Sequence, residues 1–197
     1  MGSGGSYIGY LVAKELGFKY VDHDILRQAA EYLGTDTGAL EHLDEKSPGF
    51  FEAMLRGFSY GALEAAYVPP LMQPIYGRDL FASECKIMND ILDQHSAVIV
   101  GRAGFYALKN RSRVIRVFIH APQGFRIKRV MKVQNLTDER EAQTMVEKSD
   151  RKRTRFIKDM AGVDWTDARN YHLSIDSSII DFPTCVEMIV KLQQMFN

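Results

Sequence analysis

Apolar residues recur at helical spacing close to the start of the chain. In the stretch SYIGYLVAKELGF they fall on one helical face, as Ile8, Leu11, Val12 and Leu16, and Gly17 suits the end of that helix. The same period predicts further helices over residues 25–34, 38–47, 78–95, 124–133, 137–160 and 184–196. Acidic residues in the first turn of the helix from Thr137 favour a beginning there.

Short apolar runs alternate with these helices and predict strands. The runs are KYVDHD, AVIVG, RVIRVFIHAP and HLSIDSS, over residues 19–24, 97–101, 113–122 and 172–178. Strands alternating with helices predict an α/β fold with a mostly parallel sheet covered on both faces. Ligands bind such sheets at the carboxyl ends of the strands. Polar stretches fall at three of those ends: DHD, GR and HAP.

The chain from residue 50 to 76 has a different character. It is rich in aromatic residues, methionine, glycine and proline, and its VPPLMQP stretch excludes a continuous helix. We expect irregular helices in a mobile subdomain here. No internal repeat or linker divides the sequence, so residues 1–197 are expected to form a single domain.

Composition limits the classes of partner that the protein is expected to bind. The 25 basic and 25 acidic residues balance to a formal net charge of zero, which argues against a nucleic acid polymer as the main partner. Cys85 and Cys185 lie far apart and favour free thiols in a reducing cytosol. No apolar run is long enough to span a bilayer, and the first residues lack a signal-peptide pattern. A cytoplasmic protein without a membrane partner is expected.

The chain begins with MGSGGS, directly ahead of the first helix. Glycines let backbone N–H groups converge on a phosphate, and the following helix adds its positive end. In the P-loop pattern G-x-x-x-x-G-K-[ST], Gly4 would be the last glycine, Gly5 would stand in the lysine position, and Ser6 would supply the magnesium-binding hydroxyl. The alternative is a flexible, glycine-rich terminus.

Arginines supply the second candidate chemistry. Arg102 follows Gly101 at the end of a predicted strand, where its guanidinium suits a phosphate, although a structural salt bridge is an alternative. Arg126 and Arg129 share one helix face, and Arg151, Lys152, Arg153 and Arg155 form a second cluster. Two arginine clusters on one helical hairpin suggest a lid that closes over phosphates. The alternative is an ordinary charged surface.

Four stretches together carry a family resemblance. GSGGSYIGYLVAKELGFKYVDHDIL, VIVGRAGFYAL, RVFIHAPQGFRIKRV and DRKRTRF with DWTDARNYHLSIDSS resemble the cytidylate kinase-like family of P-loop kinases, in the right order through nearly the whole chain. The resemblance implies a P-loop kinase-like, three-layer α/β/α core. It also implies a helical monophosphate-binding subdomain, over about 34–76, and a helical lid, over about 123–160.

The resemblance also implies roles for individual residues. The phosphate cradle would consist of Gly2, Ser3, Gly4, Gly5 and Ser6, with Ser6 on Mg²⁺. The segment beside the nucleotide base would include Asp176 and Ser177, and the acceptor would be held by Asp22 and Arg102. The catalytic lid residues would be Arg126, Arg129, Arg153 and Asp150. The implied reaction is phosphoryl transfer from ATP, with Mg²⁺, to CMP or a similar small phosphorylated acceptor, by a monomer or homodimer.

Two departures from cytidylate kinases proper weaken that implication. Those enzymes carry lysine where this chain has Gly5, and aspartate where it has Ala103. Gly5 is common in the cytidylate kinase-like branch, but a P-loop lysine neutralises phosphate charge during transfer. The alternative is therefore a nucleotide-binding regulatory protein with weak or no kinase activity. Members of the family also carry a short strand before the glycines. We therefore expect that strand ahead of Met1, which would then be an internal methionine of a longer natural chain.

Overall fold

The computed structural model describes residues 1–22 and 78–196. Its elements, in chain order, are α1 (Gly5–Leu16), β1 (Lys19–Val21), α4 (Arg78–Gln94), β2 (Ala97–Ile99), α5 (Gly104–Ala107), β3 (Val117–His120), α6 (Gln123–Gln134), α7 (Glu139–Ala161), the 3-10 helix η1 (Ala168–Asn170), β4 (Leu173–Asp176) and α8 (Phe182–Gln194). The helices predicted over 25–34 and 38–47 and the subdomain over 34–76 lie outside the described residues.

The described strands form two parallel pairs. β1 pairs with β2, Val21 opposite Ile99, and β3 pairs with β4, Val117 opposite Leu173. The parallel direction matches the prediction. The described strands do not form the single sheet that we expected. Among them, β2 and β3 each bond to one neighbouring strand and not to each other.

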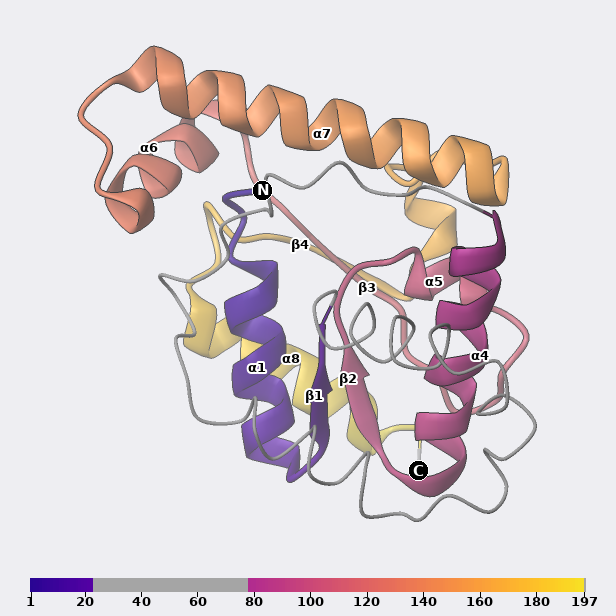
Figure 1. Cartoon of the computed structure of the whole chain (residues 1–197). Coiled ribbons are helices and arrows are strands. Elements are labelled where there is room, and N and C mark those ends of the chain that lie inside the picture. The colour runs from indigo at the N-terminus through magenta and orange to yellow at the C-terminus, as the bar shows by residue number, and fades with distance from the viewer. Residues whose placement is uncertain (23–77, 197) are drawn as a thin grey trace.

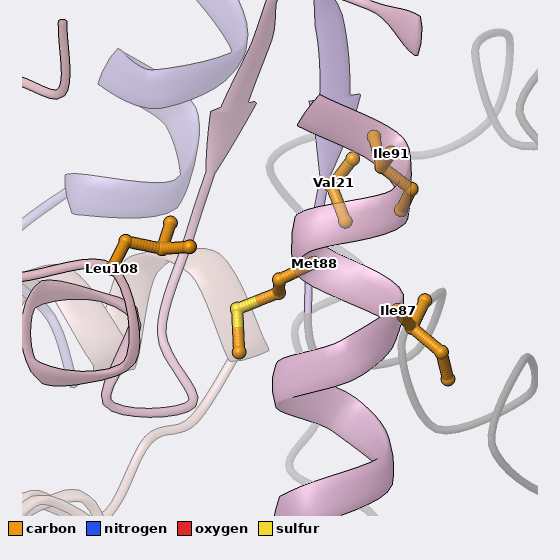
Figure 2. Packing of buried hydrophobic residues seen from close by; sticks show 5 residues of the cluster. All are labelled: Val21, Ile87, Met88, Ile91 and Leu108. Atoms are coloured by element: carbon orange, nitrogen blue, oxygen red, sulfur yellow. The ribbon is translucent and has the colours of Figure 1, made fainter. Parts of the chain in front are cut away.

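Side chains alternate along these strands and face two different cores. Val98 of β2 packs with α1 and α8, around Ile8 and Cys185. Ile99, the next residue, packs instead with α4, around Met88. Figure 2 shows this second cluster, in which Val21 of β1 and Leu108 join the apolar residues of α4. Helices therefore cover both faces of the strands, as the alternation of elements predicted.

The strands are shorter than predicted. The run over 113–122 becomes β3, Val117–His120, because Arg113 lies in a turn with a left-handed φ of 60° that extended chain does not accommodate. Likewise, the run over 97–101 stops at Ile99, since Gly101 turns the chain with a φ of 86°. Short helix α5, which the hydrophobic pattern did not reveal, follows this turn.

Helix ends follow local capping chemistry. Gly17 ends α1 with a left-handed φ of 65°, as predicted. Asp138 caps α7 by accepting from the Arg140 N–H, one residue after the expected beginning at Thr137. Asp181 accepts from the Thr184 N–H at 2.9 Å, so α8 begins at Phe182, two residues before the apolar pattern suggested.

α6 and α7 form a hairpin with a small core of its own. Ile127 and Val130 of α6 pack against Ala142 and Val146 of α7, and Met1 joins them. The hairpin lies across one end of the molecule, with the chain start beneath α7 and the first turns of α4 near the far end of α7 (Figure 1). The two helices of the predicted lid, α6 and α7, thus lie next to the glycine-rich turn.

Candidate functional site

The glycine-rich turn is closely packed. Gly2 and Gly4 have left-handed φ values of 86° and 78°, and Gly4 is the N-cap of α1. A Cβ atom on Gly2 would lie 2.6 Å from the carbonyl oxygen of Arg126, and one on Gly4 would lie 2.5 Å from the Phe182 ring. A larger residue at either position would clash, so these positions require glycine. The turn is packed against the rest of the fold, unlike the flexible terminus that the sequence left as an alternative.

Ser177 ties this turn to the carboxyl ends of β3 and β4. Its hydroxyl lies within hydrogen-bonding distance of two carbonyl oxygens, that of Ser3 at 2.7 Å and that of His120 at 3.1 Å. Asp176 accepts hydrogen bonds from the side chain and backbone N–H of Ser178, which lower the pKa of its carboxyl group. Ser177, which the family resemblance placed beside the nucleotide base, therefore contacts the predicted cradle directly.

Gly5 and Ser6 begin α1. A Cβ atom on Gly5 would meet the Ile119 Cβ at 3.7 Å, an ordinary contact, so this position accepts a side chain. Within residues 1–22 and 78–196, no group of three His, Cys, Asp or Glu side chains is placed to hold a metal ion. Mg²⁺ that accompanies a nucleotide needs only one or two protein oxygens beside phosphates and water, so the hydroxyl of Ser6 fits that role chemically.

Arg126 and Asp150, two predicted lid residues, contact each other. The Arg126 Nη1 donates to Asp150 Oδ2 at 2.8 Å and to the Met1 carbonyl oxygen at 3.3 Å. Among the residues that the structure describes, the buried Nε of Arg126 has no hydrogen-bond partner. The Met1 amine lies 3.7 Å from Asp150 Oδ1. Burial and then the charge of Arg153 lower the pKa of this amine to about 5, which places a third lid residue near the chain start.

Two other lid arginines lie over aromatic rings that sequence reasoning missed. The guanidinium of Arg129 is 4.5 Å from the centroid of Phe182, the ring that packs against Gly4. The guanidinium of Arg153 is 4.8 Å from the centroid of Trp165. Arg151 and Arg155, by contrast, are exposed and pair with acids of their own helix, as an ordinary charged surface would.

Arg102 is almost buried and forms the salt bridge that sequence analysis left as the alternative. Its Nε donates to Glu84 Oε2 at 2.8 Å, and its Nη2 bonds to the same oxygen. The guanidinium also lies 4.6 Å from the centroid of Phe156. The sequence did contain a sign that Glu84 is buried. This acid lies on the apolar face of α4, three residues before Ile87 and four before Met88.

Asp22 and Arg102 follow neighbouring strands. β1 and β2 are parallel, and the Val100 N–H donates to the carbonyl oxygen of Val21 at 2.8 Å. Asp22 and the turn that carries Arg102 therefore both lie at the carboxyl end of this strand pair. The structure thus brings the glycine-rich turn together with Ser177, Arg126 and Asp150, while Arg102 contacts Glu84 and Phe156 instead.

A cavity of about 420 Å³, widely open to solvent, lies on the segment that follows β4. It is lined by Phe125 and residues 177–183, and so shares Ser177 and Phe182 with the contacts of that turn. Ile179 on its wall is 83% exposed, which leaves an apolar surface open to a ligand. The segment after β4 therefore offers space for a planar group next to the predicted phosphate cradle.

None of the described helices combines the length and the apolar character that crossing a membrane requires. No curated protein matches the chain. Among solved structures, an uncharacterized protein from Eubacterium ventriosum ATCC 27560 is similar, with a TM-score of 0.70 and 20% identity over 98% of this chain and 92% of that one. At this identity the likeness concerns the fold alone.

The family comparison is more specific, because it covers the glycine-rich turn, the turn at Arg102, the arginine-bearing hairpin and Ser177 together. The sequence profile of the cytidylate kinase-like family matches residues 1–179. The stretches that suggested this resemblance all lie within the match. The chain belongs to the cytidylate kinase-like family.

Proposed function

We propose that the protein is an ATP-dependent phosphotransferase of the nucleoside monophosphate kinase type, acting on CMP or a similar small phosphorylated acceptor. Membership of the cytidylate kinase-like family suggests a nucleotide kinase-like function. The observation that carries the finer proposal is the packing of the turn Gly2–Gly4 against Arg126 and Ser177. Groups that we expect to bind phosphate, from distant parts of the chain, thereby lie close together.

The donor would lie at this turn. The backbone N–H groups of residues 2–6, at the positive end of α1, would hold the ATP phosphates. Ser6 would contribute its hydroxyl to Mg²⁺, which would reduce the negative charge of the phosphates. The Nε of Arg126, which has no hydrogen-bond partner in the part of the chain that the structure describes, offers a further donor beside Gly2. The cavity lined by residues 177–183 would accept the nucleotide base.

Arg153 lies over the ring of Trp165, and phosphate can replace this contact. A cation–π contact contributes about 0.5–1 kcal/mol at exposed sites. A hydrogen bond to a charged group contributes about 1.5–3 kcal/mol. We therefore expect Arg153 to leave the ring of Trp165 when a triphosphate binds. It would then supply positive charge of the kind that a lysine at position 5 would otherwise give.

The acceptor would lie near Asp22 and Arg102, which follow neighbouring parallel strands. Phosphoryl transfer requires positioning and charge neutralisation more than covalent chemistry. Arg102 would hold the phosphate of the acceptor, and this contact would favour phosphorylated over unphosphorylated acceptors. Cytidylate kinases proper carry an aspartate at the position of Ala103. The preferred acceptor therefore need not be the monophosphate of cytidine.

A regulatory, nucleotide-binding protein is the second candidate. Gly5 favours it, because the position that normally supplies a lysine carries no charge. Arg126, which could compensate, is paired with Asp150 at 2.8 Å. This candidate predicts nucleotide binding in calorimetry without phosphoryl transfer.

A coupled assay distinguishes the two functions. The full chain would be supplied with ATP, Mg²⁺ and each of a panel of nucleoside monophosphates, and ADP formation that depends on the monophosphate would be measured. Turnover with at least one of them, CMP first, is the expected result. Absence of turnover on all of them, with ATP bound, would favour the regulatory protein.

The P-loop kinase architecture is part of this proposal. Among the described residues, β2 and β3 each bond to one neighbouring strand, and every residue of both strands is half-buried. Interior strands of a parallel sheet are normally covered on both faces and bonded on both edges. A further parallel strand between β2 and β3 would satisfy both conditions and make one sheet of the two pairs.

A further inference from the structure

Arg102 and Glu84 form an almost fully buried ion pair. The side chain of Glu84 is 0% exposed and that of Arg102 is 9% exposed. Two nitrogens of the guanidinium, Nε and Nη2, bond to the single oxygen Oε2. Glu84 comes from the second turn of α4, and Arg102 from the turn after β2. The pair therefore joins a core helix to the strand end where the acceptor is proposed.

Stability alone does not account for this pair. Removing two charges from water costs several kcal/mol per ion, and well-packed apolar residues often serve as well or better. The turn is also strained, since Arg102 and Ala103 both adopt left-handed φ values, 48° and 52°. Each such non-glycine residue costs on the order of 1–2 kcal/mol, and strain of this kind collects at functional sites. A requirement to orient the guanidinium explains both observations.

The lid helix completes the arrangement. Phe156 of α7 lies over the Arg102 guanidinium, 4.6 Å from it, and meets Phe81 of α4 edge to face at 5.7 Å. The first turns of α4 lie near the end of α7 that carries Phe156 (Figure 1). Glu84 thus holds one edge of the guanidinium while Phe156 covers one face.

Three guanidinium N–H groups are left for a ligand. Arginine carries five N–H donors, and Glu84 takes one on Nε and one on Nη2. Within the described residues, no other hydrogen bond from Arg102 competes for the remaining three. Two of them are the N–H groups of Nη1, and the third is the second N–H of Nη2. Guanidinium N–H groups of this kind are suited to a phosphate.

We propose that Glu84 is a positioning residue for the acceptor: it fixes Arg102 so that the free N–H groups meet the acceptor's phosphate. Phe156 reinforces this position from the lid. The inference rests on the proposed function, because it takes the ligand of Arg102 to be the phosphate of a nucleoside monophosphate. It adds two residues, Glu84 and Phe156, that neither composition nor motif had assigned.

The test measures binding of CMP, cytidine and ATP by titration calorimetry, and the KM and kcat of the full chain where turnover is present. The variant Glu84→Gln keeps the shape of the side chain and removes its charge. We expect CMP binding to weaken roughly tenfold, the loss of one charge-assisted hydrogen bond. The KM for CMP should rise by a similar factor, while kcat, cytidine binding and ATP binding change less than about threefold.

A matched control is Asp93→Asn. Asp93 lies on the same helix and pairs with Arg111 at 2.7 Å, but its side chain is 66% exposed. This variant should leave CMP binding unchanged. If Glu84→Gln does not fold, Phe156→Leu removes the stacked ring and keeps the carboxylate, and a roughly threefold weaker CMP affinity is expected from a lost cation–π contact.

Three results would overturn the inference. Glu84→Gln could bind CMP as tightly as the wild type. It could lose CMP, cytidine and ATP together, which would indicate a role in folding alone. Finally, the wild-type chain could bind no nucleoside monophosphate; this would overturn the proposed function as well, and it is recognisable from the wild type without any variant.

Discussion

At the scale of single residues, the arginines that sequence singled out all have partners within the fold. Arg126 pairs with Asp150 and Arg102 with Glu84, while Arg129 and Arg153 lie over aromatic rings. The charge of each arginine was readable from sequence. Its partner was not, because ring contacts and buried pairs join residues that the chain places far apart.

Trp165 provides a direct reporter of one of these contacts. It is the single tryptophan of the chain, and the guanidinium of Arg153 lies 4.8 Å from the centroid of its ring. If ATP draws Arg153 away, the tryptophan emission should change on titration with ATP and saturate at the binding constant. Arg153→Gln should remove this change, whereas Lys152→Gln, an exposed neighbour, should retain it. A constant emission while calorimetry reports ATP binding would contradict the movement of Arg153.

The buried pair at Arg102 also affects a neighbouring thiol. Burial and then the charge of Glu84 raise the pKa of the Cys85 thiol to about 11. Cys185 is fully buried, and its thiol pKa is raised too. Both cysteines are free, as predicted, and both are poorly suited to act as nucleophiles at neutral pH.

At the scale of elements, the hydrophobic period located the long helices well. α1, α4, α6, α7 and α8 lie where the period placed them, within about two residues at each end. Strands were less accurate: β3 covers four residues of the ten predicted, because the chain turns at Arg113. Apolar character continues through such a turn, so the pattern alone does not mark it. Asp138 and Asp181 show that side-chain caps fix helix starts more closely than apolar spacing does.

The glycine-rich turn gives a prediction with its own control. In Gly4→Ala the new Cβ would lie 2.5 Å from the Phe182 ring, at a left-handed φ of 78°. We expect a loss of about 1–3 kcal/mol in the free energy of unfolding, and ATP affinity should fall at least tenfold. In Gly5→Ala the Cβ has ordinary contacts, the nearest at 3.7 Å, so stability should stay within about 0.5 kcal/mol of the wild type.

Urea unfolding and ATP calorimetry measure both effects. Equal stability and ATP affinity in the two variants would show that the close contact of Gly4 with Phe182 does not shape the nucleotide site. A large loss in Gly5→Ala alone would place the critical glycine one residue later.

At the scale of the whole molecule, sequence predicted an α/β fold with parallel strands and helices on both faces, and the structure has these features. The division into two strand pairs was not expected. Periodicity reports which face of a strand is buried, but it does not report which edges are bonded.

The central claim is that this lysine-free glycine-rich turn supports phosphoryl transfer. The most direct measurement supplies the full chain with Mg²⁺, CMP and ATP labelled on its γ-phosphate, and follows the label. We expect the label to move to CMP and yield labelled CDP, and Gly4→Ala to reduce the rate at least tenfold. Label that remains on ATP, with CMP and the other monophosphates alike, while calorimetry shows ATP bound, would contradict it.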